Sequence, residues 1–325
     1  TDLKLFLRYA RQASIVAVGG VVFPFILGDV LTVAFGFADG FMDVRALFIG
    51  AVLTATSIGI TVRVLEDLGS LGTPEGVTIL GAAVLDDVIG ILILTVIVGI
   101  GKDVDFSYTS VGLVALKALG FWIVLTGVGL LASKHIARFL MGFKVSGSTL
   151  ALSLSLALMA AGLAESFGLA MIIGAFSMGL ALSGTDLAES IDKPLKSVYA
   201  ALAPVFFVVM GMSVNVASLG GVWLFGLVIT FFAVIGKVVG GGLPAMFVGF
   251  NRKGSWRIGI GLLPRGEVAL VLAGIGISEG ILGSDLYTVS IMMSIITTLI
   301  APPVLAFSFR RGGSGVRAES DLSGV

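Results

Sequence analysis

The sequence predicts an all-helical, polytopic membrane protein with about ten spanning helices. The chain is 57% hydrophobic and only 12% charged, which excludes a soluble globular domain of ordinary composition. Apolar runs of roughly 20 residues, the length that a helix needs to cross a bilayer, recur along nearly the whole chain. Most of the 20 Lys and Arg residues lie in alternate connections between these runs, as in multi-pass membrane proteins.

The expected spans are joined by short connections and cover residues 12–33, 46–67, 77–100, 111–132, 148–166, 168–184, 199–215, 220–249, 257–280 and 285–309. The eighth is long enough to require a tilt, or a bend at its glycine-rich end GKVVGGGLP. The first residues, TDLKLFLRYARQ, predict a short basic amphipathic helix at the membrane interface. Residues 310–325 are predicted to form a disordered tail. Residues 1–325 are expected to form a single membrane transport domain.

The basic residues also predict the orientation of the chain. Outside the spans, only Arg45 and Lys102 fall on the side opposite the start of the first span, which places both termini in the cytoplasm. Lys117 lies near the outer end of its span and can extend to the headgroups. His135 lies in a basic loop, SKHIARF, and is expected to be solvated. The chain is therefore predicted to be an integral, multi-pass protein of the cell's inner membrane.

Composition excludes several other classes of site. The chain contains no cysteine and a single histidine, so it has no disulfide, thiolate chemistry or multi-histidine metal site. Its net charge is zero and it has no long basic tract, which gives no support to nucleic-acid binding. No cofactor is expected.

Ionisable side chains inside the predicted spans are the strongest functional signal. They are Asp86, Asp87, Lys237, Arg265 and Glu267. Charged groups at membrane depth are costly, face the protein interior or water, and mark ion pathways or proton relays. The alternative for any single residue is a buried ion pair that only fixes helix packing. Five such residues in one chain favour an ion pathway.

The adjacent aspartates cannot act on the same partner. Neighbours on a helix point about 100° apart, which excludes an intramembrane aspartyl protease, whose two carboxyls must share a proton face to face. A better arrangement turns one aspartate to a cation within the protein, for which Lys237 is available, and the other to a water-filled cavity. Because desolvation disfavours an ionised carboxylate, the second group can hold either a proton or a small hard cation.

Two spans contain residues that interrupt a helix. Hydroxyl and glycine residues crowd VLTATSIGITV (52–62), and Pro264 breaks IGIGLLPRGEVALVLA (258–273). The alternatives are a small-residue packing face in the first and an ordinary proline kink in the second. Each break lies in the middle member of three spans, and the two triplets start from opposite membrane sides. This pattern predicts inverted-topology repeats with two crossed, discontinuous helices.

Four segments in this order resemble a known family. ATSIGITVRVLEDLG, AAVLDDVIGILIL, IGKVVG and LLPRGEVALV are similar to the core of bacterial sodium/proton antiporters, closest to the NapA type within the cation:proton antiporter superfamily. The resemblance covers nearly the whole chain.

The resemblance implies roles for the site residues. Asp87 would bind Na⁺ or a proton, and Asp86 would pair with Lys237 when no cation is bound, Lys237 releasing its own proton during the cycle. Thr56 and Ser57, with neighbouring carbonyls, would line the site. Arg265 and Glu267 lie on the second broken helix. The resemblance implies that they compensate charge there.

The resemblance also implies a domain organisation. Residues of about 46–100 and 220–309 would carry the ion, and the first and intervening spans would belong partly to the scaffold of a homodimer. Family members have further N-terminal spans, so the chain is expected to lack the first ones.

The sequence therefore predicts a secondary antiporter that exchanges Na⁺ or Li⁺ for H⁺ by alternating access, electrogenic because two titrating groups are available. One alternative is a K⁺/H⁺ antiporter of the potassium-efflux type, although such relatives tend to have Gln–Asp where this chain has Asp–Asp. Another is a sodium-coupled organic-solute symporter, which would need a second polar cluster for its solute. A third is a channel, which usually presents rings of repeated polar residues.

Overall fold

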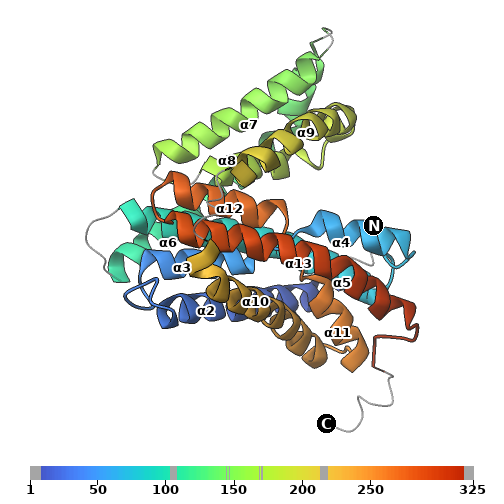
Figure 1. Ribbon diagram of the computed structural model, residues 1–325. Helices are drawn as coiled ribbons and strands as arrows, with labels where there is room; N and C mark the ends of the chain where they lie inside the picture. The colour runs from blue at the N-terminus through green and yellow to red at the C-terminus, as the bar shows by residue number, and fades with distance from the viewer. Residues whose placement is uncertain are drawn as a thin grey trace. The chain divides into compact units, whose positions relative to one another are not determined.

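The computed structural model describes residues 9–102, 108–212 apart from 144, 146, 168 and 170, and 219–317 (Figure 1). The predicted interfacial helix at the N-terminus lies mostly outside these residues. The described chain is helical throughout, with a single isolated bridge between Phe250 and Val316. It divides into two compact units, and the division falls within one helix. Unit 1 contains residues 1–90 and 214–325, and unit 2 contains residues 91–213.

The first half of unit 1 is built from the first three predicted spans. They form α2 (Ala10–Ala34), the pair α3 (Val44–Thr54) and α4 (Ile58–Asp67), and α5 (Pro74–Lys102), whose last residues from Ile91 belong to unit 2. Asp43 caps the start of α3, because its carboxylate accepts the backbone N–H of Arg45 at 2.9 Å. The chain leaves the helix at Ala55 and re-enters it after Ser57, so the predicted break in the second span is confirmed.

The second half of unit 1 contains the last three predicted spans. They form α10 (Leu219–Phe247), the pair α11 (Arg252–Gly261) and α12 (Glu267–Ser278), and α13 (Ser284–Arg310). Asn251 caps α11 by accepting the N–H groups of Lys253 and Gly254 at 3.0 Å. The proline break between α11 and α12 is confirmed, whereas α10 continues as one helix through GKVVGGGLP.

Glycines allow α2 and α10 to pack closely. A Cβ atom at Gly19 would overlap the carbonyl oxygen of Gly240 and the ring of Pro244, and one at Gly240 would overlap the backbone of Gly19. Small residues of this kind let the backbones of membrane helices approach. This contact fixes α2 within unit 1, beside the helix that carries Lys237.

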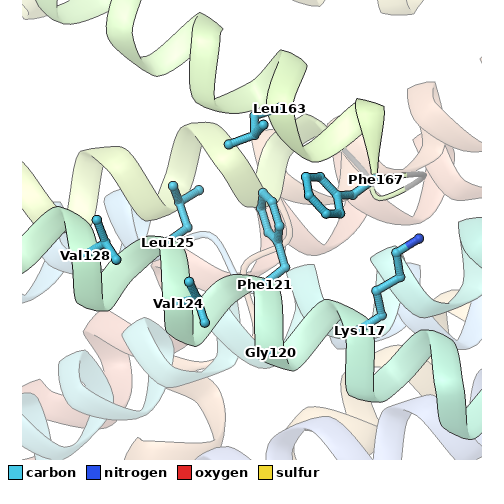
Figure 2. Close-up of a pocket in the computed structure, with 8 residues that line it drawn as sticks. All are labelled: Lys117, Gly120, Phe121, Val124, Leu125, Val128, Leu163 and Phe167. Carbon is cyan, nitrogen blue, oxygen red and sulfur yellow. The ribbon is translucent and has the colours of Figure 1, made fainter.

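Unit 2 contains α6 (Tyr108–Met141), α7 (Ser148–Ser166), α8 (Met171–Leu182) and α9 (Asp186–Met212), together with the end of α5. Here too a glycine sets the spacing, because a Cβ atom at Gly174 of α8 would overlap the backbone of Ala160 in α7. An apolar cavity of about 440 Å³ lies between α6 and the end of α7. Figure 2 shows the side chains that line it. The rings of Phe121 and Phe167 line it 5.5 Å apart, and the exposed Lys117 lies at its edge.

Seven stretches of described helix are long and apolar enough to cross a membrane, with α3 and α4 counted as one stretch. The other three predicted spans coincide with α8, with α9 and with the α11–α12 pair. The prediction of an all-helical, polytopic membrane protein is therefore confirmed.

The start of the expected disordered tail is folded against the end of unit 1. Residues 311–317, which we call the strap, follow α13 and run beside the turn between α10 and α11. The backbone N–H of Asn251 donates to the carbonyl of Gly315 at 2.9 Å, and that of Arg317 donates to the carbonyl of Gly249 at 3.0 Å. This differs from the sequence-based expectation for residues 310–317, because long-range contacts supply the hydrogen bonds. Residues 318–325 lie outside the described part of the chain.

Candidate functional site

The two helix breaks cross at the centre of the candidate site. The backbone N–H of Ser57 donates to the carbonyl of Pro264 at 2.7 Å, and the hydroxyl of Thr61 donates to the carbonyl of Gly261 at 2.7 Å. A Cβ atom at Gly266 would overlap the side chain of Ser57, so glycine permits this close crossing. Each break thus satisfies backbone groups that the other leaves without an intrahelical partner.

Asp86 is buried against this crossing and paired with Lys237. One carboxylate oxygen, Oδ2, accepts from Lys237 Nζ and from the hydroxyl of Thr56, both at 2.5 Å. The side chains of Lys237 and Asp86 are 0% and 2% exposed. Because an isolated charge in such a place costs several kcal/mol, each member of the pair makes burial of the other tolerable. The three partners come from α5, α10 and the α3–α4 break.

Asp87 lies in different surroundings although it is the next residue. It is half-buried, and its Oδ1 atom has no hydrogen-bond partner among the described residues. The helical rotation of about 100° between neighbours turns it away from the pair made by Asp86. A buried oxygen of this kind can accept a proton or a cation. Asp86 also keeps a buried oxygen, Oδ1, without a partner among the described residues, but its charge is paired with Lys237. Asp87 makes no hydrogen bond or ion pair with another described residue, so it is the aspartate whose charge is not already paired.

Glu267 and Ser57 form a second polar contact at the crossing. The hydroxyl of Ser57 donates to Glu267 Oε2 at 2.9 Å, and Glu267 is half-buried in the first turn of α12. A carboxylate at a helix N-terminus interacts favourably with the helix dipole. Ser57 and Thr56, adjacent in sequence, thus bind carboxylates on two different helices.

Arg265 joins the helices around the break. Its fully buried guanidinium donates to the carbonyl of Leu53 at 2.6 Å and to that of Ala233 at 3.1 Å. Its own carbonyl accepts the hydroxyl of Thr298 at 2.9 Å. Because Leu53 lies in the last turn of α3, the positive charge sits at the negative end of that half-helix dipole. Arg265 thus compensates a helix end within the break.

The structure adds a buried carboxylate that the sequence reading did not include. Asp29 in α2 is 8% exposed, and its Oδ1 atom has no partner among the described residues. It lies in VVFPFILGDVLTVA, five residues before the helix ends. A carboxylate so close to the end of a span is easily taken for one that reaches the membrane surface. A count of every carboxylate inside an apolar run would have found it.

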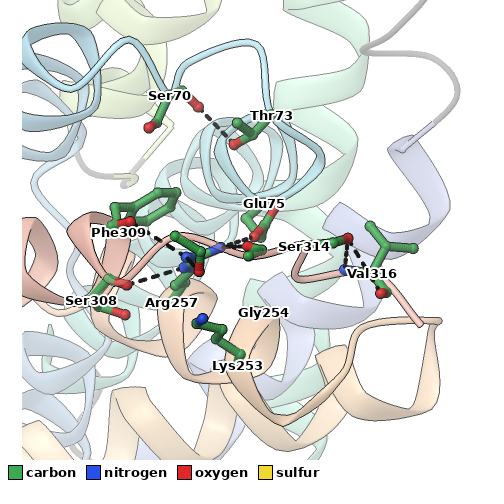
Figure 3. Close-up of polar contacts among 12 residues, drawn as sticks. Ser70, Thr73, Glu75, Lys253, Gly254, Arg257, Ser308, Phe309, Ser314 and Val316 are labelled. Carbon is green, nitrogen blue, oxygen red and sulfur yellow. Dashed lines mark hydrogen bonds and ion pairs between the residues drawn. The ribbon is translucent and has the colours of Figure 1, made fainter. Parts of the chain in front are cut away.

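A second buried ion pair lies at the end of unit 1 that carries the strap (Figure 3). Arg257 of α11 donates to Glu75 of α5 at 2.7 Å, and both side chains are about 5% exposed or less. The same guanidinium donates to the carbonyls of Gly312 and Gly313, at 2.7 and 2.9 Å. Nothing local in the sequence indicates that Arg257 is buried. This clamp ties the strap to the helix that carries Asp86 and Asp87.

Two crossed broken helices around a buried carboxylate–lysine pair define a secondary transporter with inverted repeats. Residues 1–311 match the family model described as "Sodium/hydrogen exchanger, transmembrane". The chain belongs to the sodium/hydrogen exchanger family, which is a family of transporters and not of enzymes.

Named relatives cover nearly all of the chain. The chain is 36% identical to the Na⁺/H⁺-K⁺ antiporter GerN of Bacillus cereus, over 98% of this chain and 81% of GerN. It is 37% identical to the high-affinity Na⁺/H⁺ antiporter NhaS3 of Synechocystis, over 95% of this chain and 67% of NhaS3. Its fold is similar to that of the sodium proton antiporter MjNhaP1 from Methanocaldococcus jannaschii. The TM-score is 0.73 at 18% identity, over 95% of this chain and 79% of that one.

Proposed function

We propose that this chain exchanges Na⁺ or Li⁺ for H⁺ across the membrane and that Asp87 carries the ion. The observation that supports this most strongly is the unequal state of the adjacent aspartates. Each keeps its Oδ1 atom without a partner among the described residues, but Oδ2 of Asp86 is bound by Lys237 and Thr56, whereas Asp87 has no hydrogen bond or ion pair among them. A part-dry carboxylate binds a proton or a small hard cation but not both at full strength, and this competition is what exchange requires.

Oxygen atoms near the helix crossing would complete the cation site. Sodium, like other hard cations, is held by carboxylate, hydroxyl and carbonyl oxygens. Thr56 and Ser57 supply hydroxyls, both now bonded to carboxylates, and the interrupted helices supply carbonyls. We infer that cation binding at Asp87 recruits Thr56 from its bond to Asp86, which weakens the Asp86–Lys237 pair. Arg265 and Glu267 would compensate charge at the helix ends throughout.

The exchange is proposed to be electrogenic, with two protons per cation. Asp87 would release one proton when the cation enters. Lys237 would release the other when its bond to Asp86 opens, since a fully buried ammonium without its counter-ion is costly. The stoichiometry rests on Lys237 being a titrating group.

The two units are proposed to have different roles in transport. Unit 1 holds both triplets of spans, apart from the end of α5, and every site residue, so it would carry the ion during alternating access. Unit 2 would supply the scaffold and the contacts of a homodimer. The excess of basic residues on one side supports cytoplasmic termini in the inner membrane. The paired aspartates with a downstream lysine support the NapA type.

Potassium is the second candidate substrate, because the relative GerN is named as a Na⁺/H⁺-K⁺ antiporter. The Asp86–Asp87 pair favours Na⁺, because the potassium-efflux relatives tend to have Gln–Asp at these positions.

The test is cation-induced proton movement in proteoliposomes, followed with a pH-sensitive dye. Na⁺ and Li⁺ should each dissipate an imposed pH gradient, and Asp87→Asn should abolish the response. Asp39→Asn, which removes an exposed carboxylate from the loop before α3, is the matched control and should retain activity. Unchanged activity in Asp87→Asn would refute the assignment of the ion site.

The same assay with K⁺ in place of Na⁺ tests the second substrate. An imposed membrane potential that leaves the rate of exchange unchanged would refute electrogenic exchange.

A further inference from the structure

A pocket of about 410 Å³ lies at one end of unit 1, away from the helix crossing. Three separate segments form it: the start of α2, the turn after α10, and the last residues of the strap. The residues used below are Tyr9, Arg11, Gln12, Phe247, Phe250 and Arg317. They lie on the membrane side that collects most of the basic residues of the chain.

The polar part of this pocket suits an anion. Arg11 and Arg317 both line it, and none of the lining residues is acidic. The side-chain Oε1 atom of Gln12 is buried with no partner among the described residues. Because the oxygen and nitrogen of an amide are exchanged by a simple rotation, Gln12 can present its NH₂ group to the pocket instead. Two guanidinium forks and an amide donor match the acceptor oxygens of a phosphate group.

The apolar part of the pocket points to a lipid. The ring of Tyr9 lies 6.4 Å from that of Phe250, and Phe247, in the last turn of α10, is 86% exposed. A large exposed aromatic side chain at the end of a spanning helix is typical of the membrane interface. Positive charge beside such a residue is the arrangement that attracts anionic lipids. We propose that this pocket binds the phosphate-bearing headgroup of an anionic phospholipid, with Phe247 against its acyl chains.

Occupation of the pocket would be linked to the position of the strap. Arg317 reaches the pocket only because Val316 pairs with Phe250 and because the strap is bonded to the α10–α11 turn. The strap in turn is held by Arg257, which also binds Glu75 at the start of α5. A headgroup that binds Arg11 and Arg317 together therefore stabilises the folded strap by mass action. A Cβ atom at Gly315 would overlap the carboxylate of Glu75, so Gly315→Val should displace the strap and weaken binding.

The experiment measures the thermal unfolding of the full chain in detergent, with phosphatidylglycerol or phosphatidylcholine added. Phosphatidylglycerol should raise the Tm by about 3–6 °C at a concentration on the order of 100 times its Kd, and phosphatidylcholine should not. The double variant Arg11→Ala/Arg317→Ala should lose this rise. Lys134→Ala/Arg138→Ala, which removes two exposed positive charges from α6, should keep it. Equal Tm values without lipid would show that the first variant is folded.

Three outcomes would overturn the proposal. The first is an undiminished rise in Arg11→Ala/Arg317→Ala, and the second is a rise lost equally in the Lys134/Arg138 control, which would indicate attraction by net charge alone. The third is the same arginine-dependent rise with glycerol phosphate or inorganic phosphate, which would identify a soluble anion as the ligand. Because the measurement is of binding, its result does not depend on whether the chain exchanges Na⁺ for H⁺.

Discussion

Asp86 and Asp87 are chemically identical neighbours that the fold places in unequal positions. Asp86 meets a lysine and a threonine within hydrogen-bond distance through Oδ2, and Asp87 has no hydrogen bond or ion pair among the described residues, although both keep Oδ1 without a partner. A single step along a helix is enough to produce this difference, because it rotates the side chain by about 100°. The residue with the satisfied charge is suited to hold the structure, and its neighbour is suited to bind an ion.

The Asp86–Lys237 pair should show strong coupling in a double-mutant cycle. Asp86→Asn or Lys237→Met alone leaves a buried charge without its partner, which costs about 3–5 kcal/mol. The double variant Asp86→Asn/Lys237→Met removes both charges and should lie closer to the native stability than either single variant. Thermal unfolding in detergent measures each corner of the cycle. Additive losses in the double variant would show that the two charges do not depend on each other.

Asp43, which lies outside the spans, should make a contribution to stability that depends on pH. The hydrogen bond from Arg45 lowers the pKa of the Asp43 carboxyl to about 2, and the backbone N–H groups of Asp39 and Arg45 act in the same direction. Since the pKa is below that of the unfolded chain, the contribution to stability is full above about pH 4 and is lost as the pH falls towards 2. Asp43→Ala should therefore lower the Tm at pH 7, by the equivalent of roughly 1 kcal/mol for the lost cap. The difference from the native chain should shrink on acidification, and a pH-independent difference would contradict the assignment.

At the scale of elements, glycine positions decide which helices can touch. α2 packs on α10 where Gly19 meets Gly240, and α7 packs on α8 where Gly174 meets Ala160. Other helical glycines, such as Gly162 in α7, face open space. The same residue type therefore has opposite effects on stability at different positions.

Gly19→Ala and Gly162→Ala should shift the stability in opposite directions. At Gly19 the added methyl overlaps the backbone of Gly240, so α2 and α10 must separate, which costs about 1–3 kcal/mol or more. At Gly162 nothing lies within contact distance, and alanine is favoured over glycine in a helix by up to about 1 kcal/mol. The Tm values of the two variants in the same detergent compare these effects. A stable Gly19→Ala variant would mean that the α2–α10 contact can relax at little cost.

At the scale of the molecule, the two triplets of spans form one compact unit although more than 100 residues of unit 2 separate them in sequence. Their middle helices are both broken, and each break supplies hydrogen-bond partners to the other. Neither broken helix satisfies its backbone alone, so in a membrane the two triplets must fold together. The candidate site exists only in that combined state.

Cation binding should therefore stabilise the whole unit. Na⁺ at 100 times its Kd is expected to raise the stability of the native chain by about 2.7 kcal/mol, because only the folded state contains the site. Asp87→Asn should abolish this gain, and choline at the same ionic strength should not reproduce it in the native chain. A thermal unfolding series in NaCl, LiCl, KCl and choline chloride measures the effect and orders the cations. A Na⁺-dependent rise that persists in Asp87→Asn would place the cation elsewhere.

The sequence by itself determined the fold class, the two helix breaks and the five intramembrane charges. Hydrophobic runs, Pro264 and charged residues in apolar segments act through local physics, because a helix in lipid must satisfy its own backbone and solvate its own charges. The tertiary structure decided which partners those charges meet. Nothing local to Arg257 indicates that it binds Glu75, 182 residues away, and the strap is held by that clamp and by the α10–α11 turn. Asp29 likewise looks like an interfacial residue until α2 is packed into unit 1. Burial and pairing are properties of contacts between distant segments, so they became visible only in the folded chain.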